Sequence, residues 1–109
     1  MNNAHEQLQL VYVTCPDDTI ARRIATRLVE ERSAACVNIV PALESVYRWQ
    51  GEVETASESL LIIKTRKTCL QRIQACLDEV HPDELPELVA VPIQGGTTRY
   101  LDWVLHETS

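Results

Sequence analysis

The chain has 109 residues, enough for one domain and few for two, and 45 % of them are hydrophobic. Its formal net charge of −6 argues against nucleic acid as a partner, because nucleic-acid-binding proteins carry a basic surface. The polar residues 1–7 lack a signal peptide's apolar core, and no apolar run approaches the roughly 20 residues of a membrane span. We expect a cytoplasmic protein that contacts no membrane, with a flexible N-terminus at 1–7 and a single domain at 8–109.

The first predicted elements are a strand and an amphipathic helix. Residues 8–13 are rich in β-branched and aromatic side chains and are followed by a turn at Pro16, which predicts a strand. Asp17 or Asp18 can cap the helix that follows. Apolar residues recur every three or four positions over 18–32, which predicts a helix with one face in the core.

A long, interrupted β ribbon is predicted next. Residues 35–40 form an apolar run that we expect to end at Pro41. Residues 45–49 alternate between two faces, and Gln50-Gly51 predicts a turn, after which Val53 can continue the ribbon. Residues 59–65 contain four consecutive aliphatic residues, which is typical of a strand in the middle of a sheet.

The remaining elements are a helix, a strand and a terminal helix. A capping box beginning at Thr68 starts the second helix, and His81-Pro82 ends it, because a residue before proline disfavours the α conformation. Residues 88–93 predict a strand at a sheet edge, since it contains Pro92. A Gly-Gly-Thr-Thr sequence at 95–98 then predicts a turn into a short helix.

The order of these elements predicts an α+β fold of the ferredoxin-like βαββαβ type, with a long β-hairpin and an extra C-terminal helix. Right-handed connections place both crossover helices on one face of a single antiparallel sheet. The other face then needs a cover, and Tyr12, Tyr47 and Trp49 are available to lie on it. Covering that face with further copies of the chain predicts a homo-oligomer.

The four cysteines have no C-x-x-C spacing, which excludes zinc-knuckle and thioredoxin motifs. Cys69 and Cys76 are two helical turns apart, roughly 10 Å, which is too far for a disulfide bond. We expect all four to be small buried side chains or inert thiols.

Six motifs occur in an order and spacing that resemble the CutA family of divalent-cation tolerance proteins, over about residues 8–105. They are Val11-Tyr12-Val13-Thr14 before Pro16-Asp17, Ala34-Ala35-Cys36-Val37-Asn38-Ile39, Tyr47-Arg48-Trp49-Gln50-Gly51, Glu58 through Ile62-Ile63-Lys64-Thr65, His81-Pro82 with Pro86-Glu87-Leu88, and Tyr100-Leu101-Asp102-Trp103. The resemblance implies a ferredoxin-like fold, a homotrimer similar to PII signalling proteins, and binding of copper or other divalent metal ions.

The resemblance also implies which positions could bind a metal ion. Some family members use a cysteine in the first strand and a histidine pair before the proline, but here Val13 and Val80 occupy two of those positions. The remaining candidates combine imidazole, thiolate and carboxylate donors, and binding is expected to be weak. These candidate ligands are His81, Cys15, Glu58 and Glu87.

A second set of residues is expected at a subunit interface or in a cleft between subunits. Aromatic side chains dominate such surfaces, and Lys64 either pairs locally or meets an anion there. The set comprises Tyr47, Trp49, Lys64, Tyr100 and Trp103. We predict no enzymatic activity, because no nucleophile motif or phosphate-binding arginine is evident. The alternative function is a PII-like regulatory or scaffold trimer that binds a small anion or a partner protein in these clefts.

Overall fold

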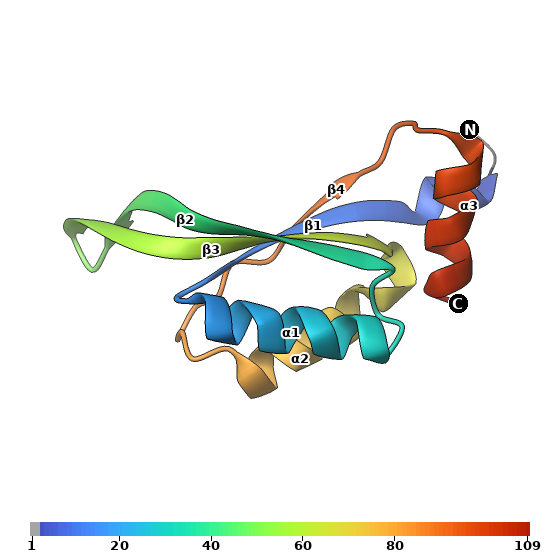
Figure 1. Ribbon diagram of the computed structural model, residues 1–109. Helices are drawn as coiled ribbons and strands as arrows, with labels where there is room; N and C mark the ends of the chain where they lie inside the picture. The colour runs from blue at the N-terminus through green and yellow to red at the C-terminus, as the bar shows by residue number, and fades with distance from the viewer. Residues whose placement is uncertain (1–2) are drawn as a thin grey trace.

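The computed structural model describes residues 3–109 (Figure 1). Its main elements follow in chain order: β1 (Leu8–Cys15), α1 (Asp18–Glu30), β2 (Cys36–Trp49), β3 (Glu52–Arg66), α2 (Leu70–Val80), β4 (Val89–Pro92) and α3 (Thr98–Glu107). The strands form one antiparallel sheet in the order β2-β3-β1-β4, and α1 and α2 lie together on one face (Figure 1). The predicted ferredoxin-like architecture is confirmed. No helix within residues 3–109 is long and apolar enough to span a membrane.

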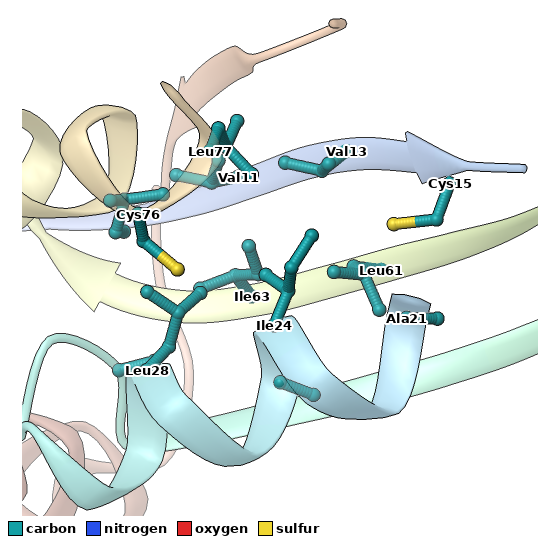
Figure 2. Close-up of a cluster of buried hydrophobic side chains, with 13 residues drawn as sticks. Val11, Val13, Cys15, Ala21, Ile24, Leu28, Leu61, Ile63, Cys76 and Leu77 are labelled. Carbon is teal, nitrogen blue, oxygen red and sulfur yellow. The ribbon is translucent and has the colours of Figure 1, made fainter. Parts of the chain in front are cut away.

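The main core lies between the sheet and the two crossover helices (Figure 2). Alternation along β1 turns Val11 and Val13 toward the helices, and alternation along β3 does the same for Leu61 and Ile63. Ile24 of α1 packs onto them, as its helical periodicity predicts. Each of these fully buried aliphatic side chains contributes about 1.5–3 kcal/mol of hydrophobic stabilisation.

The strand β2 does not end at Pro41, which corrects the sequence-based prediction. The register with β3 shifts by one residue between Val40 and Leu43, so the chain forms a bulge there and the strand continues to Trp49. Ala42 takes a left-handed conformation with φ of 59° inside the bulge. Proline is tolerated because β2 is an edge strand and the bulge interrupts its pairing.

The bulge decides which side chains point to which face of the ribbon. One extra residue reverses the alternation, so Tyr47 and Trp49 share the face of Glu58, opposite the crossover helices. The predicted turn at Gln50-Gly51 is confirmed. Both residues have positive φ, at 50° and 84°, as a tight hairpin turn requires.

The capping box at Thr68 is not formed. Thr68 lies in a short 3-10 helix, η2 (Lys67–Cys69), and α2 begins after Cys69 without a side-chain cap. The end of the helix agrees with the prediction, because His81 takes the extended conformation that Pro82 favours.

The N-terminal residues 3–7 form a 3-10 helix, η1 (Asn3–Gln7), where we expected a flexible segment. His5 is buried, and its Nε2 atom lies 2.7 Å from Asp102 Oδ1 on α3. Residues 1–2 of the expected flexible segment lie outside the described residues.

The C-terminal helix α3 closes one end of the sheet with a second small core that includes Leu8 and Leu101. Two arginines from other elements hold the end of this helix. Arg32 donates to the carbonyl of His106 at 2.7 Å, and Arg66 donates to the carbonyl of Leu105. The rest of the sheet face opposite α1 and α2 is less covered, and Val40, Val89 and Val91 are exposed there.

Candidate functional site

An open cavity of about 770 Å³ lies between the β2–β3 ribbon and the loop that follows α2. Glu58 reaches it from β3, and the loop contributes Asp83, Glu84 and Glu87. Arg48 is the one basic residue among the side chains that line it. The loop leaves α2 in this direction because the residue before Pro82 cannot continue the helix.

The electrostatics of the cavity favour cations. Burial raises the pKa of Glu87, and the neighbouring carboxylate of Glu58 raises it further. Burial also raises the pKa of Cys15 to about 12, with further contributions from Asp83, Glu58 and Asp17. The carboxylate of Glu58 therefore contributes to the raised pKa of both Glu87 and Cys15. A cation bound near Glu58 would reduce this negative potential, whereas an anion would increase it.

His81 lies next to this cavity, and hydrogen bonds occupy both of its ring nitrogens. The backbone N–H of Asp83 donates to Nδ1 at 3.1 Å, so Nε2 carries the proton and donates to the carbonyl of Thr14 at 2.8 Å. His81 is 8 % exposed. A metal ion would have to replace one of these bonds, so the role of His81 as a ligand stays a prediction.

Cys15 is buried in the main core between the sheet and α1 (Figure 2), and it is not among the residues that line the cavity. Its partner across the sheet, Ser59, also faces the helices and donates a hydrogen bond to Asp18 of α1. Glu58 precedes Ser59 and therefore faces the opposite side. The fold thus brings Glu58 and Glu87 together, places His81 beside them, and directs the thiol of Cys15 elsewhere.

No group of three or more histidine, cysteine, aspartate or glutamate side chains within residues 3–109 is arranged to hold a metal ion. The sequence interpretation missed Asp83 and Glu84 as cavity residues. The signal was present, since two acidic residues directly follow the His81-Pro82 helix stop. The four cysteines are unpaired, and three are buried while Cys36 is half-buried.

The predicted interface residues fall into separate places. Tyr47 and Trp49 border the cavity and are 44 % and 36 % exposed. Tyr100 and Trp103 form a second exposed aromatic pair on α3, with ring centroids 5.5 Å apart. These four aromatic side chains lie outside the core of the single chain. Lys64 donates a hydrogen bond to the side chain of Asn38. This agrees with local pairing, which was one of the two roles considered for Lys64, the other being contact with an anion.

An open antiparallel sheet with two helices on one face and an acidic cavity beside a long ribbon defines a ferredoxin-like protein with a candidate cation site. The family model for "CutA1 divalent ion tolerance protein" matches residues 9–107, and the chain belongs to this family.

Relatives of known name agree with this assignment. The divalent-cation tolerance protein CutA of Thermus thermophilus is 48 % identical over 100 residues, which are 92 % of this chain and 97 % of that protein. The chloroplastic protein CutA of Arabidopsis thaliana is 46 % identical over 91 % of this chain, which spans only 54 % of the plant protein. The solved structure of a divalent cation tolerance protein from Thermus thermophilus has 47 % identity and a TM-score of 0.91, covering 94 % of this chain and 99 % of the other.

Proposed function

We propose that this chain forms a cytoplasmic homotrimer that binds a divalent metal ion in the acidic cavity and catalyses no reaction. The observation that carries the proposal is that Glu58 and Glu87 both line this cavity, where burial and, to a lesser extent, the Glu58 carboxylate raise the pKa of Glu87. A divalent cation bound to the two carboxylates would oppose that shift. The family's description as divalent ion tolerance proteins supports the same ligand class.

The donor set favours weak binding of copper or another divalent ion. Glu58 and Glu87 offer carboxylate oxygens, and two such ligands hold an ion only weakly. Recruiting His81 would break its bond to Thr14 or to Asp83. Recruiting Cys15 would require deprotonating a thiol whose pKa is about 12 and turning it across the sheet. We therefore assign the main role to the carboxylates and an auxiliary role to His81.

The trimer is supported by the incompletely covered sheet face and by the projecting ribbon. Val46 and Val53 are each 64 % exposed on one face of the ribbon, while Tyr47 and Trp49 are exposed on the other. A two-stranded ribbon is marginally stable alone in water. Neighbouring subunits that pack against both faces would supply the missing burial.

The alternative of a PII-like scaffold trimer has one observation in its favour. The exposed pair of Tyr100 and Trp103 on α3 offers the kind of aromatic surface that protein partners use. The acidic cavity itself does not favour the small anion that this alternative also allowed.

Calorimetric titration with copper(II) tests the proposal. The Glu58→Gln/Glu87→Gln double variant should lose at least about tenfold in affinity, since removing a charged ligand costs more than about 1.4 kcal/mol. Cys15→Ser should bind copper like the unmodified protein.

A matched control removes the same charge from the outer surface of the helices, through Glu30→Gln/Asp78→Asn. This variant should also bind normally. Equal affinity in the cavity variant and the surface control would contradict the proposed site.

A further inference from the structure

Two buried polar side chains have atoms that no other part of the described chain pairs. Gln9 is 4 % exposed and Ser33 is fully buried. Within residues 3–109, neither Nε2 of Gln9 nor Oγ of Ser33 has a hydrogen-bond partner. Buried polar side-chain atoms in native proteins have a partner in the large majority of cases, either a protein group or an ordered water molecule. The two atoms therefore point to a ligand that can pair with them.

The two side chains lie on either side of Thr65. Gln9 of β1 and Thr65 of β3 are direct partners across the sheet, and alternation puts them on the face of Val11 and Ile63, which α1 and α2 cover. The Cβ atoms of such partners are about 4.5–5.5 Å apart. Ser33 lies in the turn between α1 and β2, and its carbonyl oxygen accepts from Oγ1 of Thr65 at 2.6 Å. Thr65 thus contacts Ser33 and neighbours Gln9, so both unpaired atoms belong to one buried site.

The chemistry of this site fits a water molecule. The amide of Gln9 and the hydroxyl of Ser33 can each donate a hydrogen bond. Oγ1 of Thr65 gives its proton to the carbonyl of Ser33 and can still accept. A water molecule that accepts from the first two groups and donates to the third makes about three hydrogen bonds, the usual number for buried water. A metal ion does not fit, because the amide nitrogen presents protons and no lone pair.

We propose that an ordered water molecule is bound inside the chain between Nε2 of Gln9, Oγ of Ser33 and Oγ1 of Thr65. This internal site is separate from the acidic cavity, so it stands or falls independently of metal binding.

The bound water would fasten the turn after α1 to the first strand. That turn holds Arg32 in a left-handed conformation with φ of 61°, which is unfavourable for a residue with a side chain. Arg32 in turn donates to the carbonyl of His106 on α3. The water therefore supports a turn through which the main domain holds its C-terminal helix.

A high-resolution crystal structure of the unmodified protein tests the inference. It should show an electron-density peak for water within about 2.6–3.2 Å of Gln9 Nε2, Ser33 Oγ and Thr65 Oγ1. A direct hydrogen bond between Gln9 and Ser33, or pairing of either atom with another protein group, would overturn the inference. Both atoms unpaired with no density between them would overturn it too.

Oxygen-17 relaxation dispersion of the solvent, which counts water molecules held inside a protein, tests the site in solution. Gln9→Met/Ser33→Ala leaves the water with only Thr65 as a partner, so this variant should hold one long-lived water fewer per chain. The control Gln74→Met/Ser109→Ala removes the same groups from exposed positions and should keep the number unchanged. Equal numbers in the buried variant and the unmodified protein would overturn the inference. If the buried variant does not fold, the crystal structure decides, because it needs no substitution.

Discussion

Replacing His81 separates a structural role from a ligand role. His81 is buried, and it accepts from the N–H of Asp83 at 3.1 Å while donating to the carbonyl of Thr14 at 2.8 Å. His81→Ala removes two hydrogen bonds and leaves two backbone groups without their partner. Both hydrogen bonds are partly buried, and each contributes about 0.5–1.5 kcal/mol, so the expected loss in unfolding free energy is about 1–3 kcal/mol.

Urea unfolding followed by tryptophan fluorescence, at one fixed protein concentration and without metal, measures this loss. His106 provides a matched control, because its side chain is 81 % exposed and its ring makes only a 3.4 Å contact with Glu107. His106→Ala should change the unfolding free energy by less than about 0.5 kcal/mol. If His81→Ala were equally harmless, the two hydrogen bonds would not explain why histidine occupies this position.

Three further predictions concern acidity and backbone strain. Since burial and Glu58 raise the pKa of Glu87, the folded state holds that proton more tightly than the unfolded state. Stability should therefore fall as pH rises through the range just above the ordinary glutamate pKa, and Glu87→Gln should lack this fall in a pH series of melting temperatures. Cys15, with a pKa of about 12, should resist iodoacetamide at pH 9 until urea unfolds the chain, as peptide mass spectrometry can show. Ala42→Gly should raise the urea midpoint by the equivalent of about 0.5–1 kcal/mol, because glycine accepts a φ of 59° without strain, and a lower midpoint would contradict this.

The sequence predicted those parts of the fold that depend on local patterns. Alternation and helical periodicity identified the strand at 8–13 and the helix that begins at Asp18, because each buries one face against the other. Pro82 predicted the end of α2, because a proline disfavours the helical conformation in the residue directly before it, His81. The family resemblance, carried by six short motifs, agrees with the match over residues 9–107.

Features that depend on pairing between distant segments were not predictable in the same way. Pro41 predicted the end of a strand. In the structure β2 continues past Pro41 because it stays paired with β3 on both sides of a bulge. The same bulge moves Trp49 to the cavity face, which no local pattern reveals. The capping box at Thr68 failed because η2 occupies that turn.

The candidate site shows the same division. Glu58 and Glu87 were each named from the sequence as possible carboxylate ligands, and the fold places both in the cavity lining, where Glu58 contributes to the raised pKa of Glu87. Cys15 was named with them, but strand alternation directs it to the other side of the sheet. The acidic Asp83-Glu84 pair after the helix stop was a signal in the sequence, but that Asp83 lines the same cavity as Glu58 depends on where the loop after α2 lies against the ribbon.

Native mass spectrometry of the intact protein with and without copper(II) tests the central claim most directly. The account predicts a species of three subunits that takes up copper, and a Glu58→Gln/Glu87→Gln variant of the same subunit number that takes up much less. A monomer, or a trimer whose copper uptake is unchanged by that double substitution, would contradict it.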